Sequence, residues 1–372
     1  VRARQSHQVL QLHGGPSVYG FTGRRRAHCG PRIATQPKAP TVPIQQLPDG
    51  RYLPEQQGHR VWWCETGLPE GAPLLVLHGG PGGRTRIAPF TWFDGLPLRC
   101  IAFDQRGCGQ SLPAGRLEHN TLSDLLGDVE RLREALGITA WGIVAGSWGA
   151  VLALAYAAAH PQRMAGLFLR SAFLGSDEEV ARFFEPWPAW LGDLGAAWLG
   201  TDSPDNPLVL LRAAAPAEPA RRTLSRTRIA IAWQAFEQAQ ARAGGLRVAP
   251  QARFAPPEGG ADTGAASADA LPASLAVQLH YLQQHCFVQP GQAEHWIDVV
   301  GATLAKRPVA LVHGLADKVC APEISARLKA RWPHAMLTEV EGAGHDMDSQ
   351  PLRQALVEQA HQWATRITHA PR

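Results

Sequence analysis

Ser147 stands in the segment Ala145-Gly-Ser-Trp-Gly149, whose residue types fit a nucleophilic serine. The apolar run Trp141–Ala145 precedes it, and the apolar stretch Ala150–Ala159, of helical length, follows it. A serine presented on a sharp turn between a strand and a helix needs small residues two positions to either side, because the helix must approach the strand closely. This segment has alanine and glycine at those positions, so Ser147 is the candidate nucleophile. A glycine-rich turn with no catalytic role could have the same sequence.

Two further residues complete a possible catalytic triad. A serine hydroxyl becomes a good nucleophile when a base accepts its proton and a carboxylate orients that base, and in strand-turn-helix hydrolases the chain order is serine, acid, histidine. Asp317 follows the apolar run Pro308–Gly314, and His345 follows Ala335–Glu341 on a loop of small residues. The alternatives are a helix-capping aspartate and a surface histidine. The order along the chain favours catalysis by a Ser147, Asp317 and His345 triad.

The glycine-rich run His78-Gly-Gly-Pro-Gly-Gly83 follows the apolar segment Leu74–Leu77. Acyl transfer places negative charge on the former carbonyl oxygen, and preorganised backbone N–H groups stabilise that charge. We therefore expect an oxyanion hole formed by the N–H of Gly79 or Gly80 together with that of Trp148. A phosphate-binding loop is the alternative, but the Lys-Ser/Thr pair that such a loop requires is missing here.

These candidate residues are separated by segments that alternate between strand and helix patterns. Leu74–Leu77 and Cys100–Phe103 are almost continuously apolar, as in strands that are covered on both faces, and Leu122–Leu136 has the periodicity of a covering helix. Such alternation predicts an α/β fold with a mostly parallel sheet flanked by helices. Active sites of these sheets lie at the carboxyl ends of the strands, which is where all three candidate triad residues fall.

The alternation is interrupted in the middle of the chain. Residues 174–298 have a helical pattern rich in Ala, Trp and Pro, which predicts a helical cap inserted into an α/β core made of residues 49–173 and 299–372. Residues 1–48 contain six arginines and one lysine but no acidic residue, and little apolar periodicity, so we predict a disordered basic tail. An organellar transit peptide or a nucleic-acid contact would have a similar composition.

Composition excludes several classes of protein. The chain has 372 residues, of which 45% are hydrophobic and 18% charged, as expected of one large soluble domain. Its net charge of +4 becomes −3 without the +7 of residues 1–48, so we expect no nucleic-acid partner. The six cysteines form no CxxC pair and have no histidine at metal-ligand spacing, so we expect no disulfide framework, metal or other cofactor.

We also expect a cytoplasmic protein without a membrane partner. The first thirty residues contain no apolar stretch long enough for a secretory signal. The segment Ile138–Ala159 is free of charges and long enough to cross a bilayer, but glycines and a serine interrupt its centre. A buried strand, a tight turn and a buried helix explain that pattern better than a membrane span does.

Several motifs of the chain resemble those of one known family. They are the glycine-rich run His78–Gly83, the octapeptide Asp104-Gln-Arg-Gly-Cys-Gly-Gln-Ser111, Asn120-Thr121, the segment Ala145–Ala157 and His160-Pro161. Together they resemble the prolyl aminopeptidases (proline iminopeptidases) of the α/β-hydrolase fold. The resemblance extends from about residue 52 to residue 368. This resemblance implies a serine peptidase, with the same triad, that removes an N-terminal residue, preferably proline, from short peptides with a free N-terminus.

The resemblance also implies how the substrate amine is bound. The family uses glutamates of the cap, and Trp233-Gln-Ala-Phe-Glu237 resembles the segment that bears one of them, while Arg170 matches a family arginine near the pocket. The second glutamate is replaced by Gln283, and Leu315 stands where the family commonly has arginine. We therefore expect an amine pocket that lacks one carboxylate. An esterase or amidase with relaxed amine recognition is the alternative, and a non-catalytic binding protein is disfavoured by the intact triad.

Overall fold

The computed structural model describes residues 46–201, 205–214, 225–243, 254–255 and 271–369. All of them belong to one compact unit, residues 38–372. The predicted basic tail, residues 1–48, therefore lies almost wholly outside the described residues. So does most of the polar stretch in the middle of the chain.

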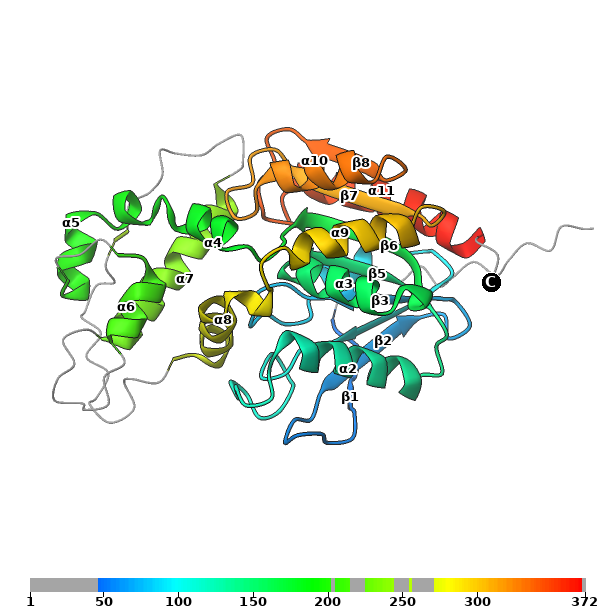
Figure 1. Ribbon diagram of the computed structural model, residues 1–372, viewed down its shortest axis with the longest axis horizontal. Helices are drawn as coiled ribbons and strands as arrows, with labels where there is room; N and C mark the ends of the chain where they lie inside the picture. Colours follow the sequence, from blue (N-terminus) through cyan, green and yellow to red (C-terminus); the bar gives the residue numbers. More distant parts are fainter. Residues whose placement is uncertain (1–45, 202–204, 215–224, 244–253, 256–270, 370–372) are drawn as a thin grey trace, which may run out of the picture. The chain divides into compact units, whose positions relative to one another are not determined.

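The described strands form a single sheet (Figure 1). They are β1 (Arg51–Tyr52), β2 (Trp62–Gly67), β3 (Ala72–Leu77), β4 (Leu98–Phe103), β5 (Trp141–Ser147), β6 (Met164–Ala172), β7 (Val309–Gly314) and β8 (Met336–Val340). Their order across the sheet is β1-β2-β4-β3-β5-β6-β7-β8. The strands β3 to β8 run parallel, and β1 and β2 are antiparallel to their neighbours. This confirms the predicted mostly parallel sheet.

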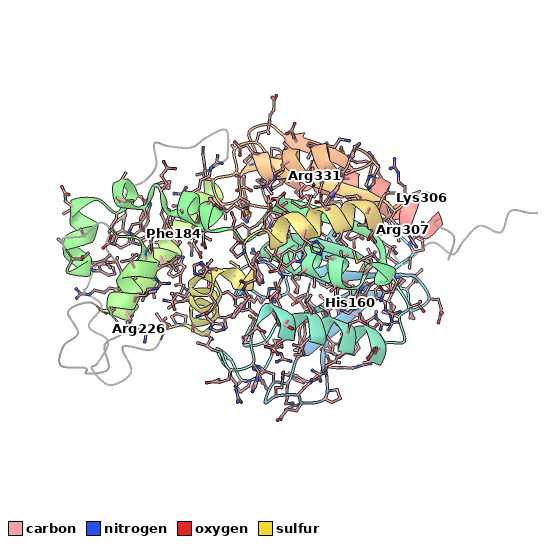
Figure 2. The ribbon with its side chains drawn as sticks, in the orientation of Figure 1. His160, Phe184, Arg226, Lys306, Arg307 and Arg331 are labelled. Carbon is pink, nitrogen blue, oxygen red and sulfur yellow. The ribbon has the colours of Figure 1, made fainter. Side chains whose placement is uncertain are left out.

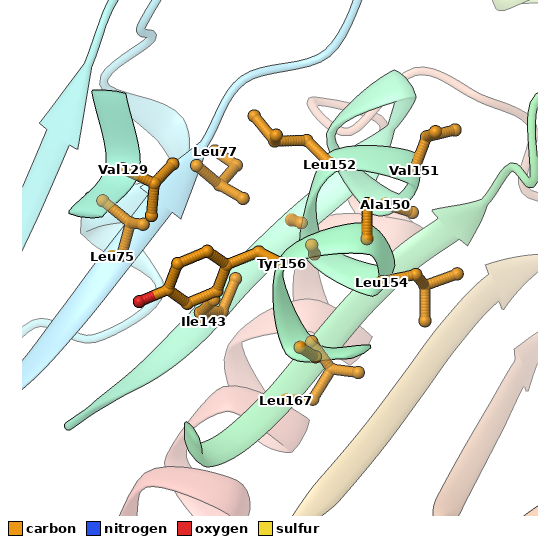
Figure 3. Packing of buried hydrophobic residues seen from close by; sticks show 14 of the residues in the cluster. Leu75, Leu77, Val129, Ile143, Ala150, Val151, Leu152, Leu154, Tyr156 and Leu167 are labelled. Atoms are coloured by element: carbon orange, nitrogen blue, oxygen red, sulfur yellow. The ribbon is translucent and has the colours of Figure 1, made fainter. Parts of the chain in front are cut away.

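Helices cover both faces of the sheet. On one face, α2 (Leu122–Ala135), α3 (Trp148–Ala159), α9 (Gln292–Thr303) and α10 (Pro322–Arg331) share a hydrophobic core with the strands. On the other face, α1 (Ala88–Thr91) and α11 (Gln350–His369) share a second core with them. Figure 3 shows α3 packed on the first face, where Tyr156 lies near Ile143 of β5.

The uncharged stretch Ile138–Ala159 is thus β5, a turn and α3. Helix α3 is apolar on every side because it is buried between the sheet and neighbouring helices. Among the residues that the structure describes, no helix has the length and apolar character required to cross a membrane.

Between β6 and β7 the described chain forms helices only. The helices α4 (Asp177–Phe184), α5 (Trp187–Leu199), α6 (Pro207–Ala213), α7 (Arg226–Arg242) and α8 (Ala273–Gln283) come first and are followed by α9. The helices α4 to α8 have their own aromatic core, in which Phe184 contacts Trp233 and Phe236 (Figure 2). This is the helical insertion expected of the fold. Helix α9 instead packs on the sheet side, through Trp296 and Val300.

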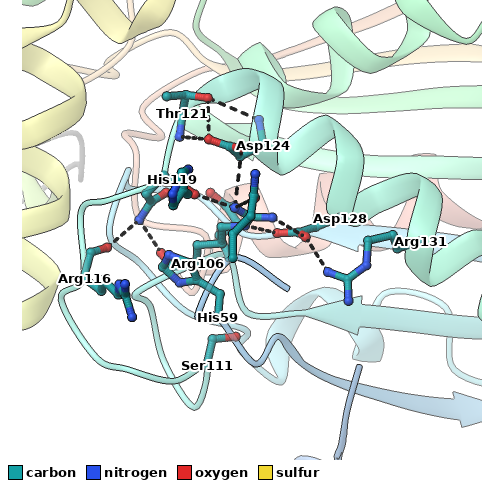
Figure 4. Close-up of polar contacts among 12 residues, drawn as sticks. His59, Arg106, Ser111, Arg116, His119, Thr121, Asp124, Asp128 and Arg131 are labelled. Atoms are coloured by element: carbon teal, nitrogen blue, oxygen red, sulfur yellow. Dashed lines mark hydrogen bonds and ion pairs between the residues drawn. The ribbon is translucent and has the colours of Figure 1, made fainter. Parts of the chain in front are cut away.

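A buried ion pair fixes the loop that follows β4. Arg106 donates two hydrogen bonds to Asp128 of α2, from Nε at 2.7 Å and from Nη2 at 3.0 Å, and both side chains are almost fully buried (Figure 4). Asn120 donates to the Arg106 carbonyl at 2.9 Å and accepts from the Tyr281 hydroxyl of α8 at 2.9 Å. The octapeptide Asp104–Ser111 is therefore held rigidly by the core and is tied to the helical insertion.

Candidate active site

Ser147 lies at the end of β5 and caps the N-terminus of α3, with φ 55° and ψ −129°. A positive φ is strained for a residue with a Cβ atom, and such strain occurs mainly at functional sites. The helix crosses close to the neighbouring strand, because a Cβ at Gly149 would come within 2.8 Å of the Leu77 carbonyl oxygen. The small residues around Ser147 therefore allow the sharp strand-to-helix turn that a nucleophilic serine requires.

Asp317 and His345 form a direct hydrogen bond at the carboxyl ends of β7 and β8. The His345 Nδ1 lies 2.8 Å from Asp317 Oδ2, while Asp317 Oδ1 accepts the backbone N–H groups of Val319 and Cys320 at 2.8 and 2.9 Å. Burial works against the charge of Asp317, but His345, the His313 side chain and the Cys320 N–H outweigh it and hold the pKa of the carboxyl well below its usual range. Asp317 is therefore ionised and can orient the His345 ring.

The Ser147 hydroxyl contacts the thiol of Cys320, with 3.8 Å between Oγ and Sγ. Among the described residues this is its side-chain partner, and the hydroxyl is not bonded to His345. Because the Cys320 backbone N–H binds Asp317, the three candidate triad residues belong to one contiguous cluster. Catalytic hydrogen bonds are often long in enzymes without substrate and tighten when substrate binds, so this geometry is compatible with a serine-histidine pair.

The electrostatic surroundings favour the neutral form of His345. Burial lowers its pKa from the ordinary 6.5, the Asp317 carboxylate raises it, and the Arg170 guanidinium lowers it again, with a net decrease. Arg170 also donates from Nη1 to the His345 carbonyl oxygen at 2.8 Å and so fixes the backbone of this loop. A neutral imidazole can accept a proton from Ser147, which is the role of the base.

We expect the reactivity of Ser147 toward an uncharged fluorophosphonate to rise with pH and to reach half of its maximum below pH 6.5. The neutral imidazole is the active form, so a lowered pKa of His345 extends activity toward acid pH. The rate of covalent labelling, followed by mass spectrometry between pH 4 and 8, measures this. An uncharged probe excludes titration of the substrate. A midpoint above pH 6.5 would contradict the assignment of the base.

The predicted oxyanion loop follows β3 and lies directly beside the nucleophile. A Cβ at Gly79 would come within 3.3 Å of the Ser147 Cβ, and Gly80 adopts φ 127°, which side chains other than hydrogen rarely allow. The Trp148 backbone follows the nucleophile, and its indole Nε1 donates to the Gln105 side chain at 2.9 Å. Both predicted sources of N–H donors, the Gly79–Gly80 backbone and that of Trp148, are therefore brought next to Ser147.

His78 connects this loop to the rigid octapeptide. Its Nε2 accepts the Gln105 backbone N–H at 3.0 Å, so its proton lies on Nδ1, which donates to the Gly79 carbonyl oxygen at 2.8 Å. Burial lowers the pKa of His78 despite the opposing effect of Asp104, so the ring is neutral. His78 therefore shapes the loop and does not contact the nucleophile.

A pocket with a cavity volume of about 60 Å³ opens above Ser147. Its walls include Phe173, Val180, Phe183, Phe184 and Leu282, which are apolar, together with Gly80, Pro81 and Val319. Its polar members besides Ser147 are Glu179, Glu237 and Gln278. The pocket therefore combines a nucleophile, an apolar wall and two carboxylates.

Glu237 is held in a defined orientation within this pocket. Its Oε1 accepts a hydrogen bond from Trp233 Nε1 at 3.0 Å and another from the Gln278 amide. No described residue donates to Oε2. Burial raises the pKa of Glu237, and the bonds from Gln278 and Trp233 offset that increase only in part. A cation that entered the pocket would stabilise the charged form of this carboxylate.

The structure places a second carboxylate in the pocket, which the sequence predicted to lack one. Glu179 of α4 lines the pocket, and its side chain also accepts backbone N–H groups of Leu174 and Ser176 at 3.1 Å. Burial raises the pKa of Glu179, while those backbone donors lower it, with a net increase. The motif Ser176-x-x-Glu179 is visible in the sequence, but it indicates a helix cap and gives no sign of the pocket.

Two of the predicted substrate-binding residues lie elsewhere. Gln283 is the last residue of α8 and does not line the pocket, whereas Gln278 and Leu282 of the same helix do. Arg170 points to the other face of the sheet and lines a different cavity. Leu315 is exposed after β7. Among the described residues, no cluster of histidine, cysteine and acidic side chains has the arrangement of a metal site.

Comparisons with known proteins identify the fold and the family. Residues 72–347 match the model of the α/β-hydrolase fold family. The proline iminopeptidase of Neisseria gonorrhoeae is 35% identical over 322 residues, covering 85% of this chain and 96% of that protein. A probable proline iminopeptidase of Leptolyngbya boryana is 32% identical over 321 residues, covering 85% and 94%.

The solved structures give the same fold. A proline iminopeptidase-related protein from Thermus thermophilus superposes with a TM-score of 0.51 at 24% identity, covering 87% of this chain and 99% of that chain. A likeness at this identity establishes the fold alone. The family model and the extent and identity of the sequence matches go further, and they show that this chain belongs to the proline iminopeptidase family of the α/β hydrolases.

Proposed function

We propose that this protein is a serine aminopeptidase that releases an N-terminal residue, preferably proline, from short peptides with a free N-terminus. The observation that carries the proposal is the pocket above Ser147, which places Glu179 and Glu237 at an apolar wall beside the nucleophile. The proline iminopeptidases among its relatives support the same substrate class.

Ser147 attacks the carbonyl carbon of the first peptide bond while His345 accepts its proton and Asp317 holds the imidazole in the required tautomer. The backbone N–H groups of Gly79 or Gly80 and of Trp148 stabilise the negative oxygen of the tetrahedral intermediate. Protonated His345 then gives its proton to the leaving amine. Water, activated by the same histidine, hydrolyses the acyl-enzyme and releases the N-terminal residue.

The two carboxylates account for the requirement for a free amine. A buried ammonium group needs a counter-charge, because its removal from water costs several kcal/mol. Oε2 of Glu237 accepts no hydrogen bond from a described residue, since Trp233 and Gln278 both donate to Oε1, so it is available to a cation. Glu179 supplies a second negative group from α4. A protonated substrate amine between Glu179 and Glu237 gives both carboxylates a positively charged partner.

The apolar wall accounts for a preference for proline. The proline ring is a compact apolar group without a donor beyond its own amine, and the wall of the pocket consists largely of phenylalanines. Phe183 and Phe184 come from α4, which also carries Glu179, so one helix presents both the apolar surface and a carboxylate. A polar or long N-terminal side chain would lose hydrogen bonds to water against this wall.

The substitution Glu237→Gln is expected to lower kcat/KM for prolyl-naphthylamide about 100-fold, because it removes a charge-assisted hydrogen bond to the ammonium group. Hydrolysis of p-nitrophenyl acetate, which has no amine, is expected to change less than about threefold. The exposed Glu178→Gln variant has the same change of charge on α4 and serves as the control. Steady-state kinetics with both substrates measure the difference.

The substrate series tests the function itself. Prolyl-naphthylamide is expected to be cleaved faster than alanyl-naphthylamide and far faster than acetyl-prolyl-naphthylamide, whose amine carries no charge. Equal turnover of the acetylated and free substrates would overturn the aminopeptidase assignment. It would favour an esterase or amidase of the same fold.

A further inference from the structure

A second pocket, with a cavity volume of about 50 Å³, lies on the face of the sheet that α1 and α11 cover. We call it the arginine pocket, defined by Arg84, Thr85, Arg86, Arg170, Trp92 and Met347. Gly79 and Gly146 also line it, and their chain neighbours Gly80 and Ser147 line the pocket of the nucleophile. The two pockets therefore meet along the oxyanion loop and the serine turn.

The three arginines of this pocket have no acidic partner among the described residues. Arg170 is 5% exposed, and its hydrogen bonds to described residues go to the His345 carbonyl oxygen and, at 3.4 Å, to the Ser171 hydroxyl. Both acceptors are uncharged. Arg84 and Arg86 are exposed at the mouth of the pocket and form no ion pair with any described residue. A buried guanidinium without a carboxylate is uncommon, because charges taken out of water need a partner.

The surrounding charges do not neutralise this region. Burial lowers the pKa of Arg170, and the charge of Arg86 lowers it further, while Asp317 and Asp346 act in the opposite direction. Asp317 is already bonded to His345, and Asp346 accepts the Asp348 backbone N–H. The nearby Asp104 accepts the backbone N–H groups of Thr85 and Gln110. Each of these carboxylates thus has other partners.

Thr85 provides an independent sign of a missing ligand. Its side chain is 5% exposed, and its hydroxyl is a buried group without a hydrogen-bond partner. Its backbone N–H is bonded to Asp104 at 2.6 Å, so the residue is held in place by its main chain. A buried hydroxyl without a partner destabilises the fold, and a bound acceptor would remove that cost.

The remaining wall of the arginine pocket is apolar. Trp92, Met347, Val76 and Val144 lie beside the polar residues. A ligand that matches both parts has a negatively charged acceptor group at one end and a small hydrocarbon body at the other. An inorganic anion would satisfy the arginines and leave the apolar wall uncovered.

We propose that the arginine pocket binds the carboxylate of a small organic acid, with Arg170 and the Thr85 hydroxyl as buried donors and Arg84 and Arg86 as charges at the mouth. The hydrocarbon body of the acid packs on Trp92 and Met347. The C-terminal residue of a short peptide and a free carboxylic acid have this same chemistry. The site does not depend on the proposed peptidase function, because it contains neither the triad side chains nor the two pocket carboxylates.

N-acetyl-leucine and N-acetyl-leucinamide test the proposal, because they share one hydrocarbon body and differ in the carboxylate. Isothermal titration of the full chain is expected to show the acid binding at least about 10-fold more tightly than the amide, and more tightly than inorganic phosphate. The Arg84→Gln/Arg86→Gln double variant is expected to weaken binding of the acid about 10-fold. The Arg242→Gln/Arg366→Gln variant, with the same loss of charge at exposed sites, is expected to leave it unchanged.

Thr85→Val separates binding from folding. Valine has the same shape and lacks the unpartnered hydroxyl, so the melting temperature is expected to stay the same or rise while the affinity for N-acetyl-leucine falls several-fold. Equal affinities for the acid and the amide would overturn the proposal, as would binding of the acid that neither Thr85→Val nor the double arginine variant weakens. Phosphate that binds as tightly as the acid would overturn the organic-acid assignment.

A kinetic comparison then distinguishes the two sources of the carboxylate. If the pocket holds the C-terminus of the substrate, the wild-type protein will cleave Pro-Leu with a higher kcat/KM than Pro-Leu-amide, and the double arginine variant will lose that preference. If it holds a free acid, the two dipeptides will be cleaved alike, and N-acetyl-leucine will still bind. Failure of both dipeptides to be cleaved would contradict the proposed function and leave the titration result intact.

Discussion

Ser147→Ala is expected to lower kcat for prolyl-naphthylamide on the order of 10⁶-fold, to the level given by the remaining binding and oxyanion groups. The substitution removes only the hydroxyl oxygen. Alanine keeps the Cβ atom, so the strained φ of 55° at the turn is unchanged, and the variant should fold like the wild-type protein. Burst and steady-state assays with the purified protein measure the loss.

Covalent labelling identifies the nucleophile independently of the substrate. A fluorophosphonate is expected to add one group to the wild-type protein, on Ser147, and none to Ser147→Ala. Ser123→Ala, an exposed serine of α2, is the control and should label fully. Unchanged labelling of Ser147→Ala, or activity within 100-fold of the wild type, would show that another residue is the nucleophile.

The core of the fold could be predicted because its signals are local. Buried parallel strands appear as short apolar runs, and each run predicted as a strand overlaps one in the sheet, such as Leu74–Leu77 in β3 and Cys100–Phe103 in β4. The positions of Ser147, Asp317 and His345 after strands could be predicted for the same reason. Parallel strands bring their carboxyl ends to one edge, so residues distant in sequence converge there.

The pocket could be predicted less well, because its walls come from segments whose packing no local pattern specifies. Glu179 stands in a helix-cap motif, and only the approach of α4 to Ser147 makes it a pocket residue. On α8, Gln278 and Leu282 are four residues apart and share a face, whereas Gln283 lies about 100° further around the helix. The family resemblance therefore selected Gln283, which lies on a different face of α8 from the residues that line the pocket.

The pairing of Gln278 with Glu237 illustrates the same limit. The two residues are distant in sequence and belong to α8 and α7, so their contact depends on how the helices of the insertion pack together. The sequence identified Glu237 through its resemblance to a family segment. It gave no sign that an amide would fix one carboxylate oxygen and leave the other for a ligand.

Asp317→Asn is expected to lower kcat about 10⁴-fold without loss of the fold. Asp317 Oδ2 accepts from His345 Nδ1, and Oδ1 accepts the N–H groups of Val319 and Cys320. Asparagine can keep its oxygen toward the two backbone groups, but its amide then faces His345 as a donor. The imidazole must take the tautomer with its proton on Nε2, and that nitrogen can no longer accept the proton of Ser147.

Asp346→Asn is the matched control, because Asp346 is the next residue along the same loop and its carboxylate accepts, from the described part of the chain, the Asp348 backbone N–H at 3.0 Å. Its kcat is expected to stay within about threefold of the wild type. Circular dichroism and melting temperature confirm that both variants are folded. If Asp317→Asn retained kcat within tenfold, a neutral group would suffice to orient His345, and the carboxylate would have to act on stability alone. The lowered pKa of Asp317 shows that its surroundings favour the charged form, which is the form that holds the His345 proton on Nδ1.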